Sequence, residues 1–144
     1  MTKKILTSLA ILFTILFAVS SCKKDSVDKK PNEDIAASVA GQYEMNYISA
    51  SGREYNLPTD AISGTVDIAN KDKNIVDMLI SITFSNGTSS PEPVDLEDVQ
   101  LKQENSAISL YYDSEKFGTI NNDELTINIP DEEGKEQIIK ARKK

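Results

Sequence analysis

Apolar and polar residues alternate along most of the chain after residue 35, and this alternation limits the fold more than any other feature of the sequence. The clearest run is Leu125, Ile127 and Ile129, in which every second residue is apolar. A period of two places the apolar side chains on one face of a β-strand, where they can be buried together. No segment of ten residues in this region has a helical period. The sequence therefore predicts an all-β domain.

Turn residues divide this pattern into about eight expected strands. Gly, Asn, Asp and Pro gather between the apolar rows, most clearly in Ser49–Pro58, in residues 69–74 and at Asn86-Gly87. Short connections favour an antiparallel meander, closed as a barrel or, as the alternative, folded as a β-sandwich. A barrel of about eight strands has room for side chains or for one small ligand. The expected strands cover residues 39–47, 62–68, 76–84, 96–104, 108–112, 117–120, 125–129 and 136–142.

The first residues have the organisation of a cleaved export signal. Met1–Lys4 is basic, and the fifteen residues Ile5–Val19 carry no charge. A helix that spans a membrane needs about 20 apolar residues, so this run is short for a permanent span. A basic start followed by a short apolar run is typical of a secretory signal peptide. We therefore expect residues 1–21 to be removed on export.

The end of this run resembles the lipobox of bacterial lipoproteins. Val19-Ser20-Ser21 supplies a branched apolar residue and two small residues before Cys22, the single cysteine of the chain. The resemblance implies that the Cys22 thiol receives a diacylglycerol and that its amine receives a further acyl chain such as palmitate. Several acyl chains anchor a protein stably, whereas one chain does not. The prediction is a lipid anchor at Cys22 in the bacterial outer membrane, with the periplasmic or surface-facing side left open.

Removal of the signal peptide would change the charge of the chain. The loss of Lys3 and Lys4 would leave 14 basic against 23 acidic side chains, a net charge of −9. An acidic chain without a basic stripe argues against binding to nucleic acid. Residues 22–36 are the expected lipidated and solvated tether, because this stretch is mostly charged residues and proline. Residues 37–144 are the expected β-domain.

Two short motifs in this domain resemble the lipocalin-like domains of small Bacteroidota lipoproteins. Val39-Ala40-Gly41-Gln42-Tyr43 is similar to the Gly-x-Trp start of lipocalins, and Ser63-Gly64-Thr65-Val66 is similar to their second strand. The resemblance implies a lipocalin-like barrel with a cup-shaped cavity. The chain has no tryptophan, so the family pattern implies that the Tyr43 ring packs across the barrel floor. It also implies that Arg142 covers Tyr43 by a cation–π contact.

The residue types exclude most catalytic chemistry. The chain has no histidine, and its single cysteine is assigned to the anchor, so histidine triads and thiolate metal sites are excluded. A glycoside hydrolase needs only two carboxylates, which leaves that class as an alternative. The acidic turns at residues 95–98, 121–124 and 131–133 lack the ligand spacing of a calcium loop. We therefore expect no enzyme activity, no cofactor and no metal.

One non-catalytic function is a binding module for a small apolar or amphipathic ligand. Tyr43 and Tyr47 are the candidate ligand-binding residues, because the alternation places both on an inward face and tyrosine offers an apolar ring with a polar tip. This function needs an open apolar cavity of roughly a few hundred Å³. If the barrel interior is packed solid by side chains such as Met45, Met78 and Phe84, a ligand held inside the barrel is excluded and this function fails.

The alternative function is a structural or interaction lipoprotein without a small-molecule ligand. Such a protein would contact an envelope protein partner through its outer face. Ile75 and Leu79 are the candidates for an exposed apolar patch, because they interrupt the polar face of their strand.

Overall fold

The structure is a computed structural model that describes residues 34–130 and 134–144. The predicted signal peptide, the predicted lipidation site Cys22 and most of the predicted tether lie outside these residues. The described residues belong to one compact unit, Asp34–Lys144. Within this unit, no helix has the length and apolar character that crossing a membrane would require.

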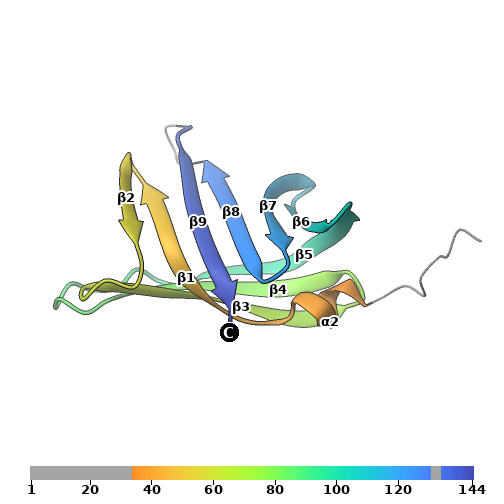
Figure 1. Cartoon of the computed structure of the whole chain (residues 1–144), viewed down its shortest axis with the longest axis horizontal. Coiled ribbons are helices and arrows are strands. Elements are labelled where there is room, and N and C mark those ends of the chain that lie inside the picture. The colour runs from red at the N-terminus through yellow and green to blue at the C-terminus, as the bar shows by residue number, and fades with distance from the viewer. Residues whose placement is uncertain (1–33, 131–133) are drawn as a thin grey trace, which may run out of the picture. The chain divides into compact units, whose positions relative to one another are not determined.

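The described chain forms one short helix followed by nine strands, as Figure 1 shows. Each strand carries at least one buried or half-buried apolar side chain, in agreement with the alternating sequence. The elements are α2 (Ile35–Val39), β1 (Gly41–Ala50), β2 (Arg53–Asn56), β3 (Ile62–Asp72), β4 (Ile75–Phe84), β5 (Val94–Glu104), β6 (Ala107–Tyr112), β7 (Glu115–Asn121), β8 (Glu124–Pro130) and β9 (Glu136–Lys143).

Antiparallel pairing closes the sheet into a barrel. Strands β3 to β9 pair in sequence order, and β1 closes the ring by pairing with β3 on one edge and β9 on the other. The ring therefore has eight strands, and β2 is an additional strand paired only with the second half of β1. Figure 1 shows β1, β9 and β8 in a row, with β3, β4 and β5 crossing them at a steep angle. The predicted antiparallel barrel is confirmed, and the sandwich alternative is wrong.

The segment Ser49–Pro58, expected to be a loop, contains the end of β1 and all of β2. Ser51 and Gly52 have φ values of 51° and 76°, and two consecutive positive φ values are typical of a tight hairpin turn. The turn is therefore only two residues long, and β1 pairs with β2 in a segment that the sequence predicted to be a loop.

Two further turns differ from the prediction. β3 continues to Asp72, so the turn expected over residues 69–74 is much shorter. Asn86-Gly87, expected to form a tight hairpin, lies instead within the longer connection 85–93 between β4 and β5. The Asn86 side chain accepts a hydrogen bond from the Thr88 N–H at 3.2 Å, so the dipeptide forms a local turn of its own.

The helix α2 covers one end of the barrel, which we call the closed end. The Asp34 carboxylate caps the helix by accepting a hydrogen bond from the Ala37 N–H at 2.9 Å. The Ala36 N–H donates to the Lys73 carbonyl in the β3–β4 turn at 3.0 Å, which ties the helix to the barrel. Ala36 and Val39 are buried as a result. Residues 35 and 36, assigned to the tether from the sequence, are thus part of this helix.

Side chains from all eight ring strands fill the barrel interior. They form a single core cluster with the buried residues of α2. Close packing of this kind leaves little space at the barrel centre. The large side chains that are fully buried are Tyr43, Met45, Met78, Leu101, Leu110, Leu125 and Ile127.

Candidate functional site

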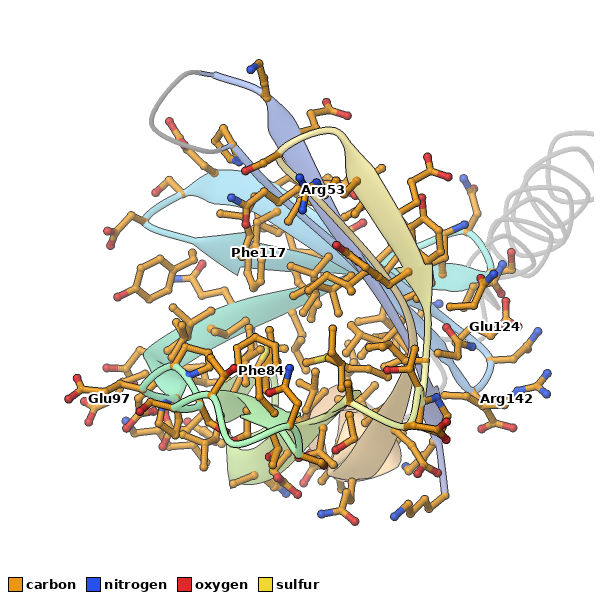
Figure 2. The ribbon with its side chains drawn as sticks, turned by 90° about the vertical axis from the view of Figure 1, so that its left-hand side faces the viewer. Arg53, Phe84, Glu97, Phe117, Glu124 and Arg142 are labelled. Atoms are coloured by element: carbon orange, nitrogen blue, oxygen red, sulfur yellow. The ribbon has the colours of Figure 1, made fainter. Side chains whose placement is uncertain are left out.

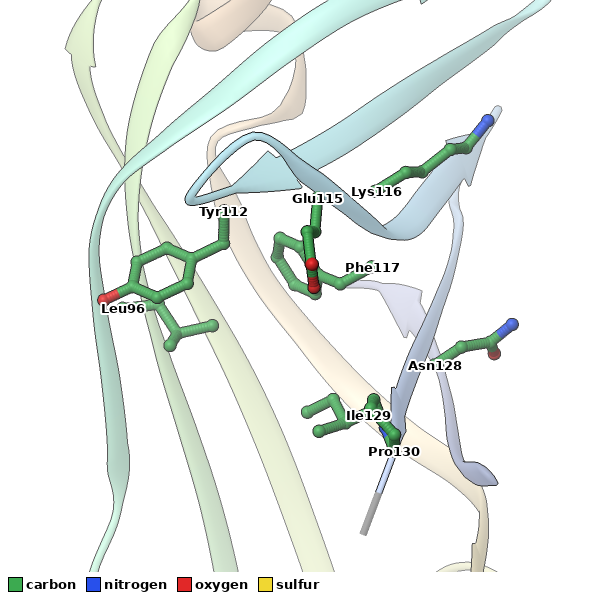
Figure 3. Close-up of a pocket in the computed structure, with 8 residues that line it drawn as sticks. All are labelled: Leu96, Tyr112, Glu115, Lys116, Phe117, Asn128, Ile129 and Pro130. Carbon is green, nitrogen blue, oxygen red and sulfur yellow. The ribbon is translucent and has the colours of Figure 1, made fainter. Parts of the chain in front are cut away.

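The opposite end of the barrel, which we call the mouth, has a gap in its wall because β6 ends early against β5 and the pairing of β7 with β8 stops at Gly118. These two strands meet at the turn Asp113-Ser114, and β5 pairs with β6 only from Gln100 onward. Residues 94–99 of β5 therefore have no strand neighbour on that edge within the described chain. Similarly, β8 pairs with β7 only up to Ile127, and residues 128–130 pair with β9 alone. The result is a notch between β5 and β8 (Figure 3).

A pocket of about 170 Å³ occupies this notch. Its floor is formed by half-buried apolar side chains, and Tyr112, which is 38 % exposed, lies at its edge. An apolar cavity of about 150 Å³ holds a molecule the size of benzene, so the notch fits one ring or a short alkyl chain. The lining residues are Leu96, Tyr112, Glu115, Lys116, Phe117, Asn128, Ile129 and Pro130.

A β-bulge in β5 turns Leu96 into this pocket. Between the pairs that Leu96 and Val99 make with β4, the single residue Asp77 opposes two residues of β5. The bulged residue Asp98 has a φ of 59°, and its N–H donates to the Asp77 carboxylate at 2.9 Å. Because a bulge adds one residue to one strand, Leu96 faces the same side as the buried Val99 despite their odd spacing.

The register of the β6–β7 hairpin separates its charged side chains. The turn at Asp113-Ser114 has φ values of 49° and 70°, as a tight hairpin requires. Tyr112 pairs with Glu115 beside the turn, and Tyr111 pairs with Lys116. Cross-strand partners lie on the same face of a sheet. Tyr112 and Glu115 therefore face the notch, and Tyr111 and Lys116 face the outside of the barrel.

Glu104 holds the outward-facing pair in place. Its carboxylate accepts hydrogen bonds from Lys116 Nζ at 2.8 Å, from the Tyr111 hydroxyl at 2.8 Å and from the hydroxyl of the buried Ser109. These hydrogen bonds, with that of Lys116 the strongest, lower the pKa of Glu104 to about 2. The Lys116 ammonium is thus neutralised outside the pocket, and Figure 3 shows its side chain extending away from the apolar lining.

The structure places the candidate Tyr43 at the closed end, outside the pocket lining. Its ring is fully buried, and its hydroxyl donates to the Val39 carbonyl at 2.8 Å. Burial, followed by the negative charge of Asp123, raises the pKa of Tyr43 to about 12. Tyr43 is therefore part of the packed floor of the barrel and is not available to a ligand at the mouth.

The cation over the Tyr43 ring is Lys143 and not the predicted Arg142. Lys143 Nζ lies 5.9 Å from the ring centroid and donates to the Ser38 carbonyl at 2.9 Å. Arg142 faces outward, with its guanidinium 3.6 Å from Glu124, and Figure 2 shows both side chains projecting from the barrel. The prediction for Arg142 is wrong by one residue, and one residue in a strand changes the face.

Tyr47 lies on the outer face of β1, so its expected inward position is wrong. The register between β1 and β9 shifts after Met45, which pairs with Ala141, and Tyr47 then pairs with the exposed Lys140. Lys140 Nζ lies 5.3 Å from the Tyr47 ring centroid. The bulge breaks the period of two, and Ile48 takes the inward position instead.

The barrel centre is packed, and the outer face of β4 is only partly apolar. Met45 and Met78 are 1 % and 0 % exposed and Phe84 is half-buried, so side chains fill the centre and the expectation of a ligand held there is wrong. The apolar space at the mouth, about 170 Å³, is smaller than the few hundred Å³ expected. Leu79 is 39 % exposed on the outer face, and Ile75 is half-buried. Asp77 lies between them and forms an ion pair with Lys71 at 3.2 Å, which interrupts the apolar patch that the interaction alternative needs.

Within residues 34–130 and 134–144, no three or more acidic or cysteine side chains converge as a metal site would require. Of the acidic turns, residues 95–98 contribute to the β5 bulge, where Asp98 pairs with Lys71 at 2.9 Å. Residues 121–124 form the turn between β7 and β8. Residues 131–133 lie outside the described chain.

The sequence interpretation identified the strands that line the notch and did not identify the notch itself. Ile129 belongs to the predicted row of Leu125, Ile127 and Ile129, and Phe117 begins a predicted strand. The apolar rows carry no signal for the gap, because it arises where the register of β6 and β7 shifts after Leu110 and the pairing of β7 with β8 stops.

These features define the protein as a closed, eight-stranded antiparallel barrel with an additional strand and an apolar pocket at its mouth. No protein-family model matches the chain, and no curated protein matches it. Among solved structures it is similar to a de novo designed fluorescence-activating β-barrel. The two are 17 % identical in sequence, with a TM-score of 0.45 over 77 % of this chain and 98 % of the designed chain.

Proposed function

We propose that the protein is a non-catalytic binding module that holds a small apolar or amphipathic ligand in the notch at the barrel mouth. The observation that supports this proposal is the apolar pocket of about 170 Å³, which remains open although the rest of the interior is packed. A ligand would insert one ring or a short alkyl chain between Leu96 and Ile129, against Phe117. Its polar part would stay at the rim.

The size of the pocket limits the affinity. Burying one apolar group of this size contributes about 1.5–3 kcal/mol. The loss of translational and rotational freedom offsets part of that gain, so simple one-ring molecules should bind with dissociation constants of roughly tens of millimolar or weaker. A tighter natural ligand would need further contacts at the rim.

Titration with benzyl alcohol, followed by NMR of the ¹³C-labelled Leu and Ile methyl groups, tests the proposal. The Leu96 and Ile129 methyl signals should shift and saturate, and those of the fully buried Leu125 should not. Leu96→Trp should fill the notch and abolish the shifts, whereas Leu79→Trp, a matched change on the outer face, should leave them unchanged. Circular dichroism checks that both variants fold. Shifts that are absent, or that survive Leu96→Trp in a folded protein, would exclude the notch as the binding site.

We also propose that the chain is an exported lipoprotein, held in the bacterial outer membrane by acyl chains on Cys22. The support for this proposal is the sequence alone: a basic start, a short uncharged run and a single cysteine after Val19-Ser20-Ser21. Cys22→Ala should move the protein from the membrane fraction to the soluble fraction, and Cys22→Ser should do the same. Unchanged fractionation of both variants would contradict the anchor.

A further inference from the structure

We infer that the notch selects an organic cation, in which an ammonium group is attached to one ring or a short alkyl chain. This inference rests on the proposed function and names the ligand class for the same pocket. It follows from the way in which the β6–β7 hairpin distributes its charges between the pocket and the outer surface.

Glu115 supplies the charge that faces the pocket. It is the cross-strand partner of Tyr112, and both side chains line the notch. Glu115 makes no ion pair with any other residue of the described chain, and its carboxylate is exposed at the rim. A ligand cation placed there would meet an unpaired carboxylate within reach of the apolar floor.

The neighbouring cation does not cancel this charge. Lys116 Nζ lies 2.8 Å from Glu104 on the outer face, where the carboxylate already neutralises it. Arg53, which Figure 2 shows at the same end of the molecule as Phe117, belongs to β2 and does not line the pocket. The exposed acids Asp95 and Glu97 flank Leu96 on β5 and add to the negative potential beside the notch.

The aromatic lining adds a second reason for a cation. Tyr112 and Phe117 both line the pocket, and the face of an aromatic ring attracts an ammonium group within about 6 Å of its centre. Asn128 and Pro130 on the β8 side carry no charge. An anionic ligand would meet the Glu115 carboxylate without a free cation in the pocket lining, so the same pocket disfavours it.

Three probes with the same ring and different charges test the inference: benzylammonium, benzyl alcohol and benzoate. Each is titrated into the protein at low salt with the Leu96 and Ile129 methyl signals as the readout. Benzylammonium should bind about fivefold more tightly than benzyl alcohol. The gain comes from an exposed ion pair with Glu115 and a cation–π contact, which the neutral alcohol cannot make. Benzoate should bind more weakly than benzyl alcohol. Added salt should reduce the advantage of the cation.

The variant Glu115→Gln should remove most of the cation advantage, so that benzylammonium binds this variant about as tightly as benzyl alcohol does. Glu44→Gln, which changes the net charge equally on the outer face of β1, should leave the order of the three probes intact. Equal affinities for the three probes, or a preference for benzoate, would overturn the inference while the proposed binding function stands. Failure of all three probes to bind would overturn the binding function itself.

Discussion

The two ends of the barrel are built from the same strands and differ in what covers their apolar side chains. On β8, Leu125 at the closed end is fully buried, and Ile129 toward the mouth is half-buried. Both residues belong to one inward-facing row. The closed end is covered by α2, whereas at the mouth the pairing of β8 with β7 stops at Ile127 and residues 128–130 pair with β9 alone. The extent of strand pairing, and not the apolar character of a row, therefore decides where this barrel stays open.

The largest expected effect comes from shortening one side chain at each end. Leu125→Ala should lower the free energy of unfolding by about 2–5 kcal/mol. The removed side chain leaves a cavity, and the packed closed end relaxes too little to fill it. Ile129→Ala in the same strand should cost only about 1 kcal/mol, because its site is already partly solvated. Urea denaturation of the two variants measures the difference. Equal losses would mean that the two ends are packed alike.

A smaller effect should follow from removing one hydroxyl at each end. Tyr43→Phe deletes the hydrogen bond to the Val39 carbonyl at the closed end and should cost about 1 kcal/mol. Tyr112→Phe at the mouth should cost little, since Tyr112 is 38 % exposed.

The stability of the closed end should depend on pH through Tyr43. The neutral form of Tyr43 is favoured in the fold, because its pKa is raised from 10.0 to about 12. Its stabilisation is complete below pH 10.0 and is lost as the pH rises through about 12. Tyr43→Phe should therefore weaken the alkaline loss of stability in a denaturation series, and an unchanged alkaline limb in this variant would contradict the assignment to Tyr43.

The smallest expected effect concerns Glu104, which holds Lys116 on the outer face of the β6–β7 hairpin. Because the pKa of Glu104 is lowered from 4.5 to about 2, its stabilisation is present above pH 4.5 and is lost as the pH falls through about 2. Glu104→Gln should flatten the acid limb of the stability curve over this range. It should also broaden the Phe117 signals, since Lys116 would lose its partner.

Much of the fold could be predicted from the sequence, because a period of two fixes which residues can share a buried face. Leu125 and Ile127 were assigned inward positions that the structure confirms. Two predictions were wrong about which face a residue occupies. The bulge in β1 places Tyr47 on the outer face, and the cation over the Tyr43 ring is Lys143 and not its neighbour Arg142.

The sequence by itself determined that the described chain would form an antiparallel meander with one buried face, since alternation and short turns act through neighbouring residues. Only the tertiary structure decided that β1 pairs with β9 to close a barrel, that α2 covers one end and that a notch remains at the other. It also decided that Glu115 faces the notch and that Glu104 holds Lys116 outside. The physical reason is that pocket shape depends on register and relative strand length, which are set between segments distant in the sequence.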